Sequence, residues 1–312
     1  MDFGKLSNVD TVDFTLPPDA PQTDALLKRL PMRVGLPRLY VGCTGWSVKE
    51  WIGRTYPKGT KPADYLREYA QQFNTIELNT THYRTPSVSD IEKWYRDTPS
   101  DFRFAPKMLQ MVSHSKNLGY GTGLTTKFCE AIAGLGEKMG VCFMQMPPHF
   151  SWREAEILEK YVSKFPKSLP LALEFRHPSV FSVQQEGHNE NLFDILEKNN
   201  VSTVITDVSG RRDVLHQRLT TTKAVIRFVG NGLHPTDYSR VDAWLSRIGN
   251  WFEAGLHECY FFTHEPDNLL SPELADYVCQ KAREKMAVIL RGPAFYDVSL
   301  SRVIENGQTR LF

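Results

Sequence analysis

The run Glu174-Phe175-Arg176-His177-Pro178 brings a carboxylate, a guanidinium and an imidazole into one short segment. Side chains two positions apart on a strand share a face, so we expect Glu174 and Arg176 on the same side. If that side faces the site, the pair can hold an anion, or the arginine can tune the carboxylate for general acid–base chemistry. The imidazole of His177 suits proton transfer as well as a loop-capping role. We therefore predict Glu174 and His177 as catalytic residues.

A second run, Glu77-Leu78-Asn79, repeats this arrangement earlier in the chain. A glutamate on each of two strands resembles the paired carboxylates of a glycosidase, one acting as acid and one as base. We therefore predict Glu77 as the catalytic partner of Glu174. The alternative is internal ion pairing, in which Arg176 or Arg227 neutralises the glutamates, because a lone buried charge is costly.

Further polar and aromatic residues stand where predicted strands end. Cationic side chains there can hold negative charge, and aromatic rings can stack on a sugar or a base. Packing around the site is the alternative role for the aromatic rings. We predict that Lys107, Arg176 and Arg227 hold the negative charge of the substrate. The full predicted substrate-binding set is Trp46, Asn79, Tyr83, Lys107, Gln145, Arg176, Asp207 and Arg227.

Metal and cofactor binding are left undetermined by the sequence. The chain has no H-E-x-x-H or structural zinc spacing, but ligands on separate strands can converge in space. Phosphate has two candidate sites, the glycine-rich segment 119–123 before a helix and the pair Arg211-Arg212. The alternatives are a flexible connector and a solvated surface. The candidate metal ligands are His82, His177, His264, Glu77, Glu174 and Asp207.

The elements that must position these residues repeat along the chain. Apolar strand-like runs alternate with amphipathic runs of helix length, and nearly continuous apolar strands indicate a parallel sheet covered on both faces. The predicted strands are 39–43, 75–79, 102–105, 141–145, 171–175, 203–207, 224–229 and 258–262. The predicted helices are 23–30, 63–73, 89–96, 125–139, 153–165, 192–198, 241–254 and 272–285.

Eight strand–helix units predict an α/β fold, a TIM-type (β/α)8 barrel whose site lies at the carboxyl ends of the strands. An open doubly wound sheet is the alternative, but Gly42-Cys43-Thr44-Gly45-Trp46 does not have its G-x-G-x-x-G fingerprint. We expect one domain at 39–290, preceded by an N-terminal extension at 1–38 and followed by a C-terminal tail at 291–312.

The composition restricts the class of protein. The 312 residues carry 37 Lys and Arg against 36 Asp and Glu, so no global basic field favours nucleic acid or a membrane surface. No apolar run is long enough to span a bilayer, and the N-terminus has no signal pattern, which favours a cytoplasmic protein. The 5 cysteines form no C-x-x-C pair and are expected as reduced core thiols. Cys43 lies near the end of the first predicted strand and is therefore a candidate nucleophile. The alternative is an ordinary buried core thiol.

Several strand-end segments together resemble the YecE-like family, catalogued as domain of unknown function 72. The resemblance implies a TIM-type barrel and a strand-end site, and it supplies no reaction. Two segments depart from the family pattern: 227–230 reads RFVG where the family has RFHG, and 262–265 reads FTHE where the family has Phe-Asn-Asn. Such changes suit a subfamily with a different substrate. The segments that carry the resemblance are 41–46, 73–79 with Tyr83, 101–105, 145–148 and 174–178.

The C-terminal residues Gln308-Thr309-Arg310-Leu311-Phe312 resemble the Q-x-x-L-F peptide that binds the bacterial sliding clamp. In this interpretation Leu311 and Phe312 fill apolar pockets while Gln308 makes a polar contact. The alternative is a tail that docks on its own barrel.

Three functional hypotheses follow from these observations. The first is an acid–base enzyme that acts on a small polar or anionic substrate at the barrel mouth. The second is a nucleic-acid-processing factor, such as a metal-dependent phosphodiesterase, that the sliding clamp recruits; this rests on fold-level analogy and on the tail. The third is a binding protein without turnover.

Overall fold

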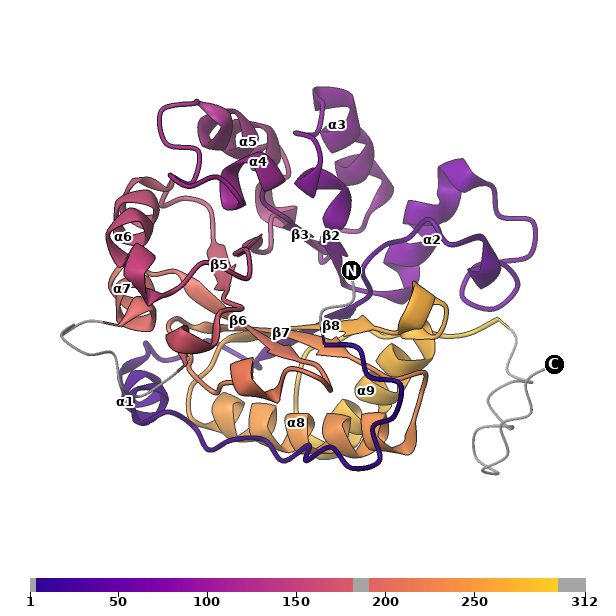
Figure 1. Ribbon diagram of the computed structural model, residues 1–312. Coiled ribbons are helices and arrows are strands. Elements are labelled where there is room, and N and C mark those ends of the chain that lie inside the picture. The colour runs from indigo at the N-terminus through magenta and orange to yellow at the C-terminus, as the bar shows by residue number, and fades with distance from the viewer. Residues whose placement is uncertain (1–3, 182–190, 297–312) are drawn as a thin grey trace.

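The computed structural model describes residues 4–181 and 191–296 of the chain. Parallel strands alternate with helices throughout, as the hydrophobic pattern predicts (Figure 1). The strands are β1 (Arg38–Gly42), β2 (Thr75–Leu78), β3 (Arg103–Pro106), β4 (Cys142–Gln145), β5 (Leu171–Glu174), β6 (Ser202–Asp207), β7 (Lys223–Val229) and β8 (Glu258–His264).

The strands follow the neighbour order of a TIM-type barrel. One sheet has the order β1-β8-β7-β6-β5-β4, and β2 pairs with β3 in a second sheet. Hydrogen bonds also span the two seams between these sheets. The Glu77 amide donates to the Cys43 carbonyl at 3.0 Å across the β1–β2 seam, and the Met108 amide donates to the Phe143 carbonyl at 2.8 Å across the β3–β4 seam.

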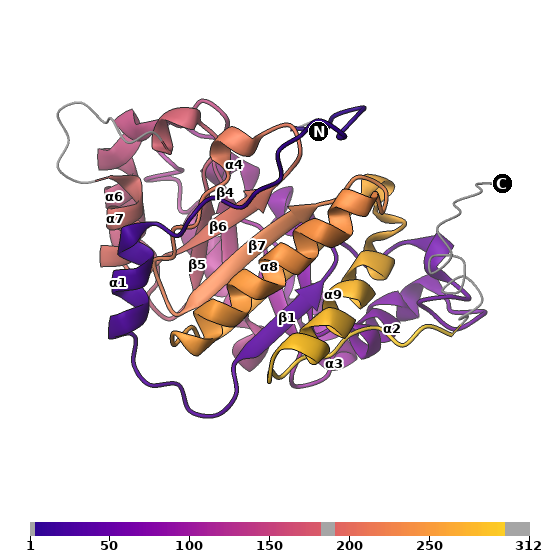
Figure 2. The same cartoon turned by 90° about the horizontal axis from the view of Figure 1, so that it is seen from below.

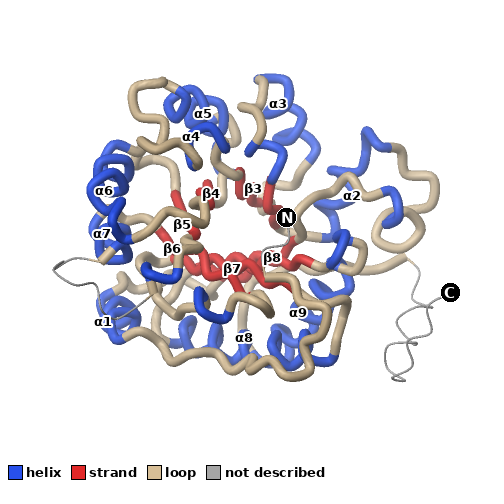
Figure 3. The backbone as a smooth tube through the Cα atoms, viewed as in Figure 1, coloured by secondary structure: helices blue, strands red, loops and turns tan. Residues whose placement is uncertain are grey.

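Helices surround the strands (Figure 3), and α8 and α9 cover the outer face of β1, β7 and β8 (Figure 2). The order of strand, helix and strand confirms the predicted α/β fold class. The helices are α1 (Pro21–Arg29), α2 (Tyr65–Gln72), α3 (Val88–Asp97), α4 (Gln110–Ser113), α5 (Leu124–Ala133), α6 (Ala155–Lys164), α7 (Leu192–Lys198), α8 (Pro235–Glu253) and α9 (Ser271–Lys285).

The start of α8 differs from the prediction. The helix begins at Pro235 rather than at residue 241, because proline suits the first helical position and the His234 side chain accepts the Thr236 amide as an N-cap. The apolar periodicity that marks the buried face begins only at Val241, so it does not reveal this first polar turn.

Alternation along the strands divides the core into two layers. Side chains such as Phe143, Val204 and Tyr260 form a cluster inside the strands, while Ile205 and Phe261 belong to the larger cluster between strands and helices. Position parity on each strand therefore decides whether a side chain points to the interior or to the helices.

The N-terminal extension lies across the domain. From Gly4 the chain passes over the carboxyl ends of β6 to β8 and along α8 to α1 (Figure 1). The bounds of α1, Pro21–Arg29, are close to those of the helix predicted at 23–30. The Gly210 amide donates to the Gly4 carbonyl at 2.8 Å, and Arg247 donates to the Pro17 carbonyl at 3.1 Å. The extension is thereby tied to the strand-end face that the sequence singles out.

Candidate functional site

A buried ionic network lies at the carboxyl ends of the strands, and Arg227 on β7 is its centre. Arg227 Nε and Nη2 donate to the two carboxylate oxygens of Glu77 on β2 at 2.8 and 2.9 Å. Arg227 Nη1 donates to Glu174 Oε2 on β5 at 2.7 Å. One guanidinium therefore joins the two glutamates that the sequence predicts as a pair, across the interior of the barrel.

The network continues from Glu174 toward β3 and β4. Arg176 Nε donates to Glu174 Oε1 at 2.7 Å, so the two side chains share one side as the alternation predicts. Gln145 Oε1 accepts from Arg176 Nη2 at 2.9 Å and from Lys107 Nζ at 3.1 Å. Three cationic side chains thus meet two carboxylates, which leaves one positive charge in excess when all five are ionised.

Glu77 holds two further groups. Asn79 Nδ2 donates to Glu77 Oε1 at 2.9 Å, and His264 Nε2 lies 3.0 Å from Glu77 Oε2. His264 ends β8 and is partly exposed, whereas Glu77 is fully buried. The sequence predicts His264 as a strand-end residue and a candidate metal ligand, but not as a partner of Glu77. Its place beside Glu77 could not be found from the sequence, because it depends on the meeting of β2 and β8.

The charges of the network set its proton affinities. Burial opposes ionisation of Glu174, but the adjacent Arg176 and Arg227 outweigh it and hold the pKa of Glu174 at about 2. Burial likewise disfavours the charged form of Glu77, and Arg227 and His264 still hold its pKa well below the usual range. Burial, followed by the charge of Arg227, lowers the pKa of Lys107 to about 8. Burial lowers the pKa of His264 more than Glu77 raises it, which favours the neutral imidazole.

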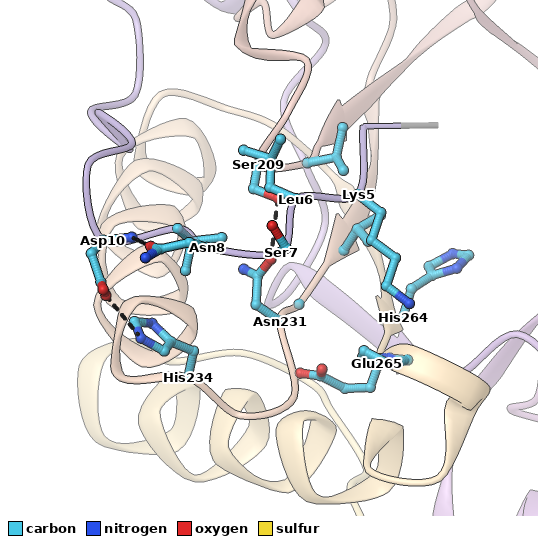
Figure 4. A pocket seen from close by; sticks show the side chains of 15 residues that line it. Lys5, Leu6, Ser7, Asn8, Asp10, Ser209, Asn231, His234, His264 and Glu265 are labelled. Carbon is cyan, nitrogen blue, oxygen red and sulfur yellow. Dashed lines mark hydrogen bonds and ion pairs between the residues drawn. The ribbon is translucent and has the colours of Figure 1, made fainter. Parts of the chain in front are cut away.

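A cavity of about 460 Å³ adjoins this network on the side of β7 and β8 (Figure 4). The N-terminal segment 5–10 forms one wall, and the loops after β6, β7 and β8 form the other. His264 belongs both to this cavity and to the network, so it connects the solvent-accessible space with Glu77. The polar lining includes Lys5, Asp10, Asn231, His234, His264 and Glu265.

Glu265 is a buried acid in this cavity wall. Its Oε2 accepts the Gly232 amide at 2.7 Å, while Oε1 has no hydrogen-bond partner among the described residues. Burial, with the charge of Asp237 next, raises the pKa of Glu265 to about 8. A Cβ at Gly230 would lie 2.1 Å from Glu265 Oε1, so glycine is required for this side chain to fit.

The predicted place of Asp207 at the barrel mouth is wrong. Asp207 is fully buried and faces the helices, where it accepts from Arg240 Nη2 at 2.8 Å and from Trp244 Nε1 at 2.7 Å. Its neighbour Thr206 has the parity of Val204, which is an interior residue. Alternation along β6 could have shown that Thr206, rather than Asp207, points inward.

The remaining predicted site residues lie outside the network. His177 Nδ1 accepts the Ser179 amide at 3.2 Å, which is the loop-capping geometry. Trp46 is half-buried, with its ring edge-on to Trp94, and Tyr83 is 76% exposed. Their roles in catalysis or substrate binding stay predictions.

The other sequence candidates have structural partners. All five cysteines are buried free thiols, and burial raises the pKa of Cys43, so its thiol is unreactive at neutral pH. Arg211 pairs with Asp213, and Arg212 pairs with Asp207.

Over residues 4–181 and 191–296, no three His, Cys, Asp or Glu side chains are grouped so that they could hold a metal ion. In that same part of the chain, no helix has the length and apolarity needed to cross a membrane. The tail residues Gln308, Leu311 and Phe312 lie outside the described residues.

Comparison with known sequences identifies a family. The pattern of the family described as "Protein of unknown function DUF72" matches residues 40–295. The UPF0759 protein YecE of Escherichia coli K12 is 27% identical over 272 residues, which cover 82% of this chain and 97% of that protein. The UPF0759 protein YunF of Bacillus subtilis is 28% identical over 151 residues, or 46% of this chain and 52% of that protein.

Solved structures of this family have a similar fold. A DUF72 family protein of Thermotoga maritima superposes with a TM-score of 0.57 at 26% identity, over 79% of this chain and 98% of that one. A DUF72 family protein of Enterococcus faecalis gives a TM-score of 0.62 at 19% identity, over 79% of this chain and 98% of that one. These similarities agree with the barrel order of the strands.

Proposed function

This chain belongs to the DUF72 family, and from the geometry of its site we propose that it is an acid–base enzyme that acts on a small anionic substrate. The observation that carries the proposal is the buried network of Glu77, Arg227, Glu174, Arg176 and Lys107 beside His264. Burying this many charges stabilises a fold poorly compared with apolar packing, so their retention at a strand-end face favours function.

The network favours His264 as the proton-transfer group. The low pKa values of Glu77 and Glu174 make both carboxylates weak bases and poor proton donors at neutral pH. Their suitable role is to orient other groups. With the Nε2 proton of His264 donated to Glu77, the other ring nitrogen of the neutral imidazole keeps a lone pair and can act as a general base.

The excess cationic charge favours an anionic substrate. Lys107 and Arg176 converge on Gln145, and a monoanion placed beside them would neutralise the excess charge. The adjoining cavity of about 460 Å³ is within the usual range for sites of small molecules. The charge of the network therefore suits a small anion, and the cavity offers space beside His264 at its edge.

Binding of a simple anion tests the first part of the proposal. We expect inorganic phosphate to raise the melting temperature of the wild type and to bind weakly by calorimetry. Lys107→Met should reduce that affinity at least about tenfold, or about 1.4 kcal/mol. The matched control is Lys223→Met, because Lys223 pairs with Glu258 at the opposite end of β7. Equal phosphate binding by all three proteins would contradict the anion site.

Depletion of metabolites tests the catalytic part. A mixture of small phosphorylated and carboxylated metabolites is incubated with the enzyme and followed by mass spectrometry. We expect the wild type to deplete at least one compound, and His264→Gln to lose this turnover while still binding phosphate. Phosphate binding without depletion of any compound would instead support a binding protein without turnover.

A further inference from the structure

Lys107 has surroundings unlike those of an ion-paired lysine. It is only 8% exposed, and its Nζ donates to the neutral amide oxygen of Gln145 at 3.1 Å. No carboxylate forms an ion pair with it in the described part of the chain, because Arg176 and Arg227 occupy Glu174 and Glu77. The amine is thus oriented by a neutral acceptor. Burial and the charges of Arg227 and Arg176 disfavour its protonation, against the opposing charges of Glu77 and Glu174.

A second buried lysine shows the contrast. Lys138 Nζ donates to the backbone carbonyl of Thr98 at 2.6 Å and also bonds the Tyr95 carbonyl, so its donors stabilise the end of α3. This is a structural role on the outside of the barrel. Lys107 instead follows β3 at the strand ends, where Gln145 joins it to the buried ionic network.

We propose that Lys107 is a nucleophile that forms an imine with the carbonyl carbon of a small anionic aldehyde or ketone. The inference rests on the proposed function, since it uses the same site and names its substrate class. The neutral amine attacks the carbonyl carbon, the oxygen takes up the proton that the nitrogen loses, and the carbinolamine then releases one water as the C=N bond forms. No oxidant or reductant is consumed.

Two features of the site support this step. A pKa of about 8 leaves a useful fraction of the amine neutral near physiological pH, which an ordinary lysine does not offer. The ammonium gives one proton to solvent before the attack, and the imine nitrogen takes one back after water leaves. The protonated imine therefore has the same charge as the original lysine ammonium. The carboxylate of a monoanionic substrate therefore still meets one excess cation, as in the network before reaction.

Reductive trapping tests the proposal on the full-length protein. Wild type is incubated with pyruvate and sodium cyanoborohydride, and intact mass and peptide mapping locate the adduct. We expect one reduced pyruvate per chain, on Lys107, with a labelling rate that rises between pH 7 and pH 9. Lys138 serves as the internal control and should stay unlabelled. Acetone, which has the carbonyl without the carboxylate, should react at least about tenfold more slowly.

Variants separate the nucleophile from the anion site. Lys107→Met and Lys107→Arg should both lose the adduct, and circular dichroism establishes that each is folded. Lys107→Arg keeps the charge and should therefore still bind phosphate. Phosphate binding by the wild type without a Lys107 adduct would overturn the imine proposal and leave the proposed function standing. Absence of both phosphate binding and the Lys107 adduct in the wild type would contradict both the proposed function and the imine proposal. Labelling of surface lysines in Lys107→Met at the rate seen in the wild type would also overturn the imine proposal.

Discussion

At the scale of single residues, the two departures from the family pattern concern one spot. Val229 and His264 stand at paired positions of β7 and β8, and both line the cavity beside Glu77. The resemblance implies a histidine at position 229, whereas this chain has its histidine at position 264. An imidazole is thus supplied near the network from β8 instead of β7. This suits a change in how the substrate is approached while the arginine and the glutamates keep their places.

Because of Glu265, we expect the stability of the domain against unfolding to depend on pH. Its carboxyl titrates at about 8 when folded, against 4.5 for an ordinary glutamate. Between these values the folded state holds a proton that the unfolded state has lost, so stability falls as pH rises from about 4.5 to about 8. Glu265→Gln cannot ionise and should lack this loss. We expect the variant to melt at least about 3 °C above the wild type at pH 9.

The comparison at low pH provides the control for this prediction. At pH 4.5 to 5 both proteins carry a neutral side chain at position 265, so their melting temperatures should be close. The measured quantity is the difference between the two proteins at each pH, which cancels the titration of groups that they share. A difference that stays constant from pH 5 to pH 9 would show that Glu265 ionises normally in the folded protein.

At the scale of elements, β6 offers a matched pair of neighbouring substitutions. Asp207 accepts from Arg240 and Trp244 on α8 and pairs with Arg212, so Asp207→Asn removes the anion of Arg212 and leaves the buried Arg240 with Asp237 alone. We expect a loss of about 3 kcal/mol or more in the free energy of unfolding. Thr206 Oγ1 is buried and has no hydrogen-bond partner among the described residues, so Thr206→Val should leave stability unchanged or raise it by about 1 kcal/mol. Urea denaturation measures both.

The outcome distinguishes the two faces of the strand. A large loss for Thr206→Val with little effect of Asp207→Asn would mean that β6 presents the opposite parity. That result would restore Asp207 to the barrel mouth.

The elements themselves were largely predictable, and their contacts were not. Buried apolar runs mark β4, β5 and β7 closely, because parallel strands covered on both faces are almost continuously hydrophobic. The shared side of Glu174 and Arg176 also followed from alternation alone. The contact of Glu77 with His264 joins residues 187 positions apart, so no local pattern specifies it. A charged residue at a strand end does not by itself indicate a site, because the parity of Asp207 along β6 directs it to the helices.

At the scale of the whole molecule, the N-terminal extension and the barrel form one surface. The segment 5–10 supplies a wall of the cavity, and the Gly4 carbonyl bonds the loop after β6. The sequence predicts an N-terminal extension at 1–38, but it does not indicate which face of the domain the extension covers. Its position over the carboxyl ends of the strands follows from backbone hydrogen bonds that the sequence does not encode locally. The extension therefore belongs to the description of the site as much as the barrel does.

Recruitment by a partner is the remaining prediction at this scale, and it concerns the tail. Gln308, Leu311 and Phe312 lie outside the described residues, so the resemblance to a clamp-binding peptide alone supports the prediction. We expect the full-length protein to bind a purified bacterial sliding clamp in calorimetry, with an affinity that does not depend on the barrel site. Alanine at these three positions should weaken binding at least about tenfold, because two apolar anchors and a polar contact are lost together.

The two intervening positions of the peptide provide the matched control. Alanine at both Thr309 and Arg310 should keep most of the affinity, since the pattern leaves these positions unspecified. His264→Gln should bind the clamp as the wild type does, because a tail peptide docks independently of chemistry at the barrel mouth. Retained binding by the triple variant would place the contact elsewhere on the surface. Failure of the full-length protein to bind a sliding clamp would contradict the prediction of recruitment through the tail.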